Sequence, residues 1–154
     1  MADYTPQNPG FRAVVRESFA RQIFMTTLGA RLVRVEAGDV RIAMPYAPAF
    51  TQQNGFLHAG AVASIADSAN GYAALSLCPP GHDVLAVEFK INLLSPAAGP
   101  WLLACGRVLR PGRTLTTCFC DVWSATDETA DVPAGAKRVA SMLSTIISQP
   151  AAGA

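Results

Sequence analysis

Hydrophobic and polar residues recur along the chain with two different periods, and these periods divide it into helices and strands. Near the N-terminus, hydrophobic residues return at steps of three or four: Phe11, Val14, Val15, Phe19 and Ile23. This spacing predicts an amphipathic helix from about residue 10 to residue 26, within an N-terminal helical segment at residues 1–29. A β-hairpin with strands at residues 30–36 and 39–45 follows, because Ala37-Gly38-Asp39 marks a turn. A polar loop at residues 47–57 comes next.

A second helix is predicted at residues 58–77, and it is hydrophobic on nearly all sides. It contains seven alanines between Ala59 and Ala74 and ends before Pro79-Pro80-Gly81. We therefore expect it to be buried on most sides, with side chains small enough to let a sheet approach closely.

The rest of the chain has the period of β-strands. In residues 84–94 the alternation predicts one hydrophobic face and one polar face, made of Leu85, Val87, Phe89, Ile91 and Leu93 against Glu88, Lys90 and Asn92. Three more strands are predicted at residues 101–110, 113–126 and 136–148, and residues 149–154 read as a disordered tail. This order of elements favours a single α+β domain over residues 1–154, with an antiparallel sheet wrapped around a long central helix.

The composition bears on partners and location. Charged residues make up 15% of the 154 residues, where about 25% is usual, so we expect part of the surface to be buried in a homo-oligomer. A net charge of +1 argues against nucleic-acid binding through a broad basic face. There is no hydrophobic run long enough to span a membrane and no secretory signal, so a cytoplasmic protein is expected.

The four cysteines do not indicate a metal or disulfide framework. No two of them form a C-x-x-C pair, and Cys118 and Cys120 alone are too few to hold a metal ion. We expect reduced thiols and no metal.

Two polar side chains stand out in the second helix. His58 lies at its start and Asp67 near its middle, in the sequence NGFLHAGAVASIADSANGYAAL. A buried carboxylate is costly unless it is paired, so Asp67 either faces solvent or has a function. Nine residues turn a helix by about 900° and advance it by about 13 Å. The two side chains of one chain are therefore on opposite sides, and they can share a site only if they come from different chains.

The start of this helix offers a different kind of chemistry. Free backbone N–H groups and the positive end of the helix dipole point outward at Ala59 and Gly60. Small side chains there allow a ligand atom to approach, so the turn could hold an anion or a developing oxyanion. The imidazole of His58 either orients this turn or takes part in the chemistry.

The segment GFLHAGAVASIADSANGYAAL resembles the helix of hot-dog-fold acyl-CoA thioesterases of the PaaI type. VEFKINLLSPA and VLRPGRTLTTCFCDVW resemble a strand and a hairpin of the same family, and the likeness covers roughly residues 30–148. The resemblance implies a dimer or a dimer of dimers with two sites at the dimer interface. It also implies no cofactor other than the coenzyme A of the substrate.

The resemblance also assigns roles to residues. Asp67 matches the carboxylate that acts as base or nucleophile, and the N–H of Ala59, where the family usually has Gly, matches the group that polarises the thioester carbonyl. Gln52, or alternatively Asn54, matches the loop residue that places the water. Ala86 stands where some members have a Ser or Thr. The candidates for binding the phosphates of coenzyme A are Lys90, Arg110, Gly112 and Arg113.

The sequence leaves two alternatives to a thioesterase. One is a hot-dog enoyl-CoA hydratase or dehydratase, although the H-FPG loop of dehydratases is missing from the sequence. The other is a non-catalytic acyl-CoA-binding protein.

Overall fold

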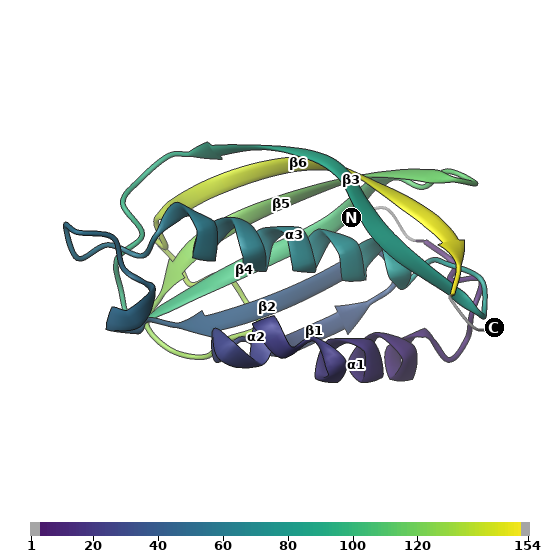
Figure 1. Cartoon of the computed structure of the whole chain (residues 1–154), viewed down its shortest axis with the longest axis horizontal. Coiled ribbons are helices and arrows are strands. Elements are labelled where there is room, and N and C mark those ends of the chain that lie inside the picture. The colour runs from purple at the N-terminus through teal and green to yellow at the C-terminus, as the bar shows by residue number, and fades with distance from the viewer. Residues whose placement is uncertain (1–3, 152–154) are drawn as a thin grey trace.

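A six-stranded antiparallel sheet curves around one long helix, α3 (Ala59–Leu75), as Figure 1 shows. The structure, a computed structural model, describes residues 4–151. The strands are β1 (Arg31–Glu36), β2 (Asp39–Pro45), β3 (His82–Leu93), β4 (Trp101–Arg110), β5 (Leu115–Ala125) and β6 (Arg138–Pro150). They lie in the order β1-β2-β4-β5-β6-β3, and every neighbouring pair is antiparallel. The α+β architecture and the wrapped central helix predicted from the sequence are therefore confirmed.

The N-terminal segment differs from the single helix that its hydrophobic spacing predicts. It forms α1 (Phe11–Arg21) and the short α2 (Ile23–Thr27), which are separated at Gln22. Gln22 has an extended backbone, with φ −82° and ψ 90°. The break turns Ile23 outward, where 81% of its surface is exposed, so Ile23 does not share the buried face of Phe11 and Val15.

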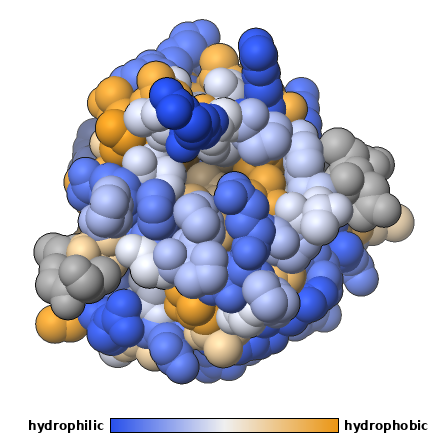
Figure 2. Space-filling view, turned by 90° about the vertical axis from the view of Figure 1, so that its right-hand side faces the viewer, coloured by the Kyte–Doolittle hydropathy of each residue, from blue (hydrophilic) through white to orange (hydrophobic). Residues whose placement is uncertain are grey.

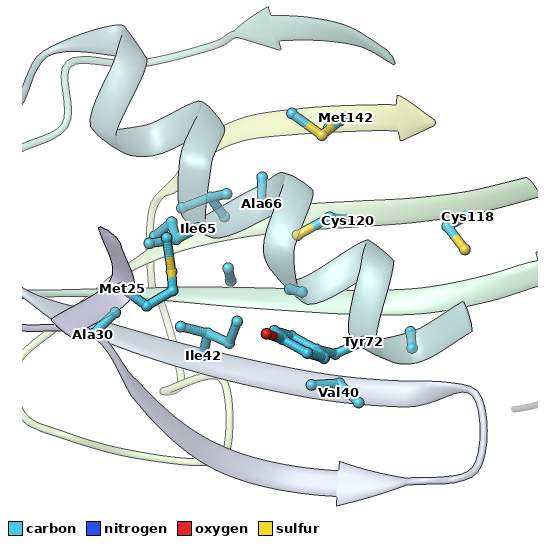
Figure 3. Packing of buried hydrophobic residues seen from close by; sticks show 14 of the residues in the cluster. Met25, Ala30, Val40, Ile42, Ile65, Ala66, Tyr72, Cys118, Cys120 and Met142 are labelled. Carbon is cyan, nitrogen blue, oxygen red and sulfur yellow. The ribbon is translucent and has the colours of Figure 1, made fainter. Parts of the chain in front are cut away.

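The core lies between α3 and the concave face of the sheet, as Figure 3 shows for Ile65, Ala66 and Met142. The small residues of α3 bring its backbone directly onto β4. A Cβ built at Gly106 would lie 2.4 Å from the carbonyl carbon of Ala69. The close approach expected from the alanine-rich sequence is thus present, and Gly106 is the residue of β4 that permits it.

The face of β3 changes partway along the strand. Its pairing with β6 shifts between Ala86 and Glu88, so that Val87 is an extra residue in the ladder. Opposed residues of an antiparallel pair share a face. Ala86 is therefore on the helix side with buried Ile146, and Leu85 is not on the face of Ile91 as simple alternation predicts.

The chain end is also more ordered than the predicted tail. β6 continues to Pro150, and the N–H of Ala151 donates to the carbonyl of Gly81 at 2.9 Å. Residues 152–154 of the predicted tail lie outside the described residues. Among residues 4–151, no helix has both the length and the hydrophobicity needed to cross a membrane.

Candidate active site

The first turn of α3 is closed by His58. This residue is the N-cap, and its Nδ1 accepts the N–H of Gly60 at 2.9 Å. Its carbonyl accepts the N–H groups of Ala61 and Val62 at 3.0 and 3.3 Å. The ring is thus a capping group, and Nδ1 carries no proton when it accepts this bond.

The capping leaves one free donor at the start of the helix. The N–H of Gly60, expected to help bind an oxyanion, is already donated to His58. The N–H of Ala59 has no acceptor within the helix, and none appears elsewhere in residues 4–151. Ala59 is exposed, so a ligand can reach this N–H.

The loop before α3 forms a tight turn at residues 51–57, closed by a bridge between Thr51 and Leu57. The side-chain oxygen of Gln52 accepts the backbone N–H of Asn54, which fixes the Gln52 side chain. Gln52 and Ala59 both line one cavity of about 380 Å³, called the Ala59 cavity here. Its other lining residues are Phe56, Leu57, Val62, Leu93, Leu94, Ser95, Pro96, Ala97 and Val139. Asn54 does not line it.

Asp67 lies on the outward side of α3 and is half-buried. Its Oδ1 is buried and accepts no hydrogen bond from any residue in the described part of the chain. Burial raises the pKa of this carboxyl above its ordinary value of 3.8. A partly desolvated carboxylate without a partner is suited to taking a proton or attacking a carbon atom.

A second cavity of about 220 Å³, called the Asp67 cavity here, lies beside this carboxyl group. Its wall is formed by α1 with its C-cap Gln22, by α3, by the first half of β3 and by one residue of β6. The lining residues are Ser18, Gln22, Asp67, Ser68, Gly71, Tyr72, Asp83, Val84, Leu85, Ala86 and Ile146. It shares no lining residue with the Ala59 cavity. Eight residues of helix, about 12 Å, separate Asp67 from Ala59, so these two groups of one chain do not act on the same atom.

The candidate phosphate-binding residues do not form a single cluster. Arg110, Gly112 and Arg113 are exposed in the hairpin between β4 and β5, whereas Lys90 is exposed in the middle of β3. The hairpin projects at the end of the sheet where β3 begins (Figure 1). The surface at this end is mostly hydrophilic with scattered hydrophobic residues (Figure 2). Neither cavity described above includes any of these four residues.

The sequence alone did not point to Ser18, Gln22 or Asp83 as neighbours of Asp67. Gln22 donates from Nε2 to Ser68 Oγ at 3.4 Å, and its Oε1 accepts the hydroxyl of Tyr72 at 3.2 Å. These contacts join residues 46 and 50 positions apart, and no local pattern in the sequence encodes them. No group of three or more His, Cys, Asp or Glu residues within 4–151 could hold a metal ion.

Comparison with known proteins identifies the relatives of this chain. A sequence profile described as the thioesterase superfamily matches residues 54–130, which contain both the first turn of α3 and Asp67. A protein of Saccharolobus solfataricus that carries the name of an esterase is 34% identical over 123 residues, 79% of this chain and 82% of that protein.

Two solved structures are similar to this chain over nearly its whole length. A thioesterase family protein from Silicibacter pomeroyi has 43% sequence identity and a TM-score of 0.85, covering 92% of this chain and 100% of that chain. The E. coli PaaI protein from the phenylacetic acid degradation operon has a TM-score of 0.79 at 18% identity, covering 96% of this chain and 97% of that chain. At that identity the second likeness shows the fold only.

Proposed function

Because the chain belongs to the thioesterase superfamily and has its hot-dog fold, we propose that it hydrolyses the thioester bond of an acyl-CoA or aryl-CoA. The products are the free acid and coenzyme A. The reaction takes place at a site shared by two copies of the chain, with Asp67 from one copy and the first turn of α3 from the other.

The positions of the two cavities along β3 carry this proposal. The Asp67 cavity is lined by the start of β3, at residues 83–86, and the Ala59 cavity by its end, at Leu93 and the adjoining Leu94. A two-fold axis at the middle of an antiparallel strand pair puts the start of one strand beside the end of the other. Pairing of β3 with a second β3 therefore joins each Asp67 cavity to the Ala59 cavity of the partner.

The two edges of the sheet differ in a way that favours pairing at β3. β1 is flanked by ion pairs of Arg31 with Glu128 and of Arg34 with Asp131, and charged groups discourage edge pairing. β3 is twelve residues long and leaves Leu85, Val87 and Phe89 about half exposed, at 56%, 56% and 45%. Long hydrophobic edges of this kind are covered in native proteins.

The chemistry of the joined site follows from its groups. The thioester carbon lies against the ionised Asp67, which either takes a proton from an attacking water or attacks to form a mixed anhydride that water then hydrolyses. The partner's Ala59 donates its N–H to the developing oxyanion. The carbon–sulfur bond breaks, and the coenzyme A thiolate leaves. It takes the proton held by Asp67 in the first route and a proton from bulk water in the second. Gln52 and His58 come from the same chain as this Ala59. Gln52 holds the water, and His58 fixes the turn that presents the N–H of Ala59.

The hairpin residues Arg110, Gly112 and Arg113 are proposed to bind the phosphates of coenzyme A, with Lys90 as a further cation on β3. Arginine forms two parallel hydrogen bonds with a phosphate group, and exposed backbone N–H groups at a tight turn can add to them.

Hydrolysis of a set of acyl-CoA esters, measured beside hydration of an enoyl-CoA, tests the proposed function. We expect thiol release from at least one ester and no hydration. Asp67→Asn, which keeps the shape of the side chain but cannot accept a proton or attack, should lower kcat by about 10² or more. Hydration without thiol release, or full kcat in a folded Asp67→Asn variant, would contradict it.

A further inference from the structure

A third cavity, called the α2 groove here, lies on the other side of the first turn of α3. Its volume is about 380 Å³. Its walls come from α2, from the short 3-10 helix η1 (Pro48–Phe50), from the start of α3 and from one capping residue of each of these helices. Phe24, Leu28 and Phe50 form a hydrophobic lining, and His58 lines the groove beside them. The groove shares no lining residue with the Ala59 cavity, and the proposed reaction does not use it.

The outer side of α2 carries a strongly exposed hydrophobic side chain. Among the large hydrophobic residues that the structure describes, Ile23 is the most exposed, at 81%, and the adjacent Phe24 is exposed at 53%. Phe24 lines the α2 groove. A hydrophobic knob and a hydrophobic groove are therefore neighbours on one surface. In a two-fold interface a surface meets its own copy, so each Ile23 can enter the groove of the other chain.

The surface around the knob and the groove is built from two segments without ionic side chains. No Asp, Glu, Lys or Arg occurs at residues 22–30 or 42–66, and all 12 basic and 11 acidic residues lie elsewhere in the chain. Charged residues are depleted in the cores of protein–protein interfaces. An uncharged hydrophobic surface is best covered by another of the same kind. A second copy of this chain supplies one, whereas a nucleic acid or an acidic peptide does not.

The first turn of α3 connects the α2 groove with the active site. Ala59 and Val62 line the Ala59 cavity on one side of this turn. His58, Gly60 and Ala61 line the groove on the other side. The hydrogen bond of 2.9 Å between His58 Nδ1 and the N–H of Gly60 caps the helix here. A side chain seated in the groove shields this bond from water, and hydrogen bonds are stronger in surroundings of low polarity. An occupied groove therefore fixes the turn that presents the N–H of Ala59.

We infer that the α2 groove is a second interface between copies of the chain, in which Ile23 of each copy enters the groove of the other. α2 lies on the side of the molecule away from β3 (Figure 1), so both interfaces form at once. The two grooves of a β3-paired dimer are related by its two-fold axis. One further two-fold axis through both grooves therefore closes a dimer of dimers.

The second interface gives each active site a third chain. The Ile23 that packs beside His58 comes from the other dimer and acts as a positioning residue for the turn at Ala59. This catalytic role rests on the proposed function, whereas the interface itself does not. The contact is small beside the pairing of the twelve-residue β3, so it separates first on dilution.

Light scattering on the full chain tests the interface. At micromolar concentration the wild type should have four times the chain mass of 16.2 kDa. Ile23→Lys puts a charge on the knob, and Ala49→Trp fills the groove from η1; both should leave dimers. Leu143→Lys is the matched control and should remain a tetramer, because Leu143 is also exposed, at 46%, but is on the opposite face of the sheet from α3. Its neighbour Ser144 accepts a hydrogen bond from Asn70 of α3, and successive residues of a strand point to opposite faces.

The value of kcat per chain tests the link to the active site. On an acyl-CoA that the wild type hydrolyses, Ile23→Lys should lower kcat by about fivefold and leave KM unchanged. The turn at Ala59 loses its support, while the groups that bind the substrate are untouched. Dilution of the wild type until the tetramer separates should lower kcat by the same factor. Leu143→Lys should keep the wild-type kcat.

The results distinguish the interface from the proposed function. A wild-type dimer, or a tetramer that both Ile23→Lys and Ala49→Trp leave intact, would overturn the interface. A tetramer that only Leu143→Lys splits would also overturn it and would place the contact on the outer face of the sheet. An Ile23→Lys dimer with full kcat would overturn the link to the active site. If no acyl-CoA is hydrolysed, the proposed function fails, and the mass measurements still decide the interface.

Discussion

At the start of α3, the backbone N–H of Ala59 has no acceptor within the described residues, whereas those of the next three residues do. The N–H groups of Gly60, Ala61 and Val62 are taken up by His58, which leaves that of Ala59 to polarise a carbonyl. The family's usual Gly is replaced here by Ala, but the proposed donor belongs to the backbone and is kept. The side chain matters only because it is small enough to let the ligand approach.

Ala59→Pro removes this N–H with little change to the helix. Proline is tolerated in the first helical position, and His58 already has the extended backbone, φ −62° and ψ 141°, that a residue before proline prefers. We expect kcat to fall by about 10² to 10³, with circular dichroism and oligomeric state unchanged. Ala59→Ser, which keeps the N–H, is the control. Equal rates for the Pro and Ser variants would exclude this donor.

Asp67 should make the fold less stable at neutral pH. Burial raises the pKa of this carboxyl in the folded state, so between the unfolded and folded pKa values the folded chain binds more protons. The contribution of Asp67 to the free energy of unfolding therefore falls as the pH rises through that range. The full destabilisation by the ionised carboxylate is present above the raised pKa. Below the ordinary value of 3.8 both states are protonated and the cost disappears.

Thermal unfolding of Asp67→Asn against wild type measures this cost. We expect the variant to have the higher Tm at pH 7 and the difference to shrink as the pH approaches 3.8. A variant that is less stable at pH 7 would indicate that the ionised carboxylate has a stabilising partner.

The elements of this protein were predictable where they are fixed by local sequence. The first hairpin and β4 lie where the hydrophobic pattern and the Gly38 turn place them. The break at Gln22 and the extra residue at Val87 were not predicted, because both serve contacts with distant elements. Gln22 contacts α3, and the shift at Val87 sets the register between β3 and β6.

In the candidate site too, the features within one stretch of sequence were predictable, and those that depend on distant elements were not. Asp67 and the turn at His58 could be recognised because they lie within one helix. The cavity beside Asp67 could not, because its walls come from α1, α3, β3 and β6, which only the fold brings together.

The contact between α3 and β4 predicts a strong effect at Gly106. A Cβ there would lie 2.4 and 2.5 Å from the carbonyl carbon and oxygen of Ala69, two residues beyond Asp67. Gly106→Ala must therefore push the helix off the sheet, and we expect it to lower the free energy of unfolding by about 1–3 kcal/mol and to lower kcat by displacing Asp67.

Gly71→Ala, in the same helix, is the matched control. Nothing lies within 4 Å of a Cβ built at Gly71, so helix propensity should raise the free energy of unfolding by up to about 1 kcal/mol. Denaturant unfolding of both variants makes the comparison. An unchanged midpoint for Gly106→Ala would mean that the helix can shift without cost.

The proposed active site needs two chains of the protein. Light scattering at micromolar concentration should give at least twice the chain mass of 16.2 kDa. Val87→Lys, which places a charge on the β3 edge, should shift the protein toward the monomer and reduce its activity in parallel. Ile23→Lys alters an even more exposed hydrophobic residue away from that edge and should remain at least a dimer. A wild-type monomer with full activity would contradict the shared site.

Mixing two inactive variants tests the shared site most directly. Asp67→Asn and Ala59→Pro are each expected to be inactive as homodimers. In a mixed dimer, one site contains both changes and the other contains neither, because Asp67 of one chain works with Ala59 of its partner. After co-refolding at equal concentrations, about half of the dimers are mixed and activity should return to about a quarter of wild type. No recovery, with mixed dimers demonstrated by mass spectrometry, would show that both groups act within one chain and would contradict the account.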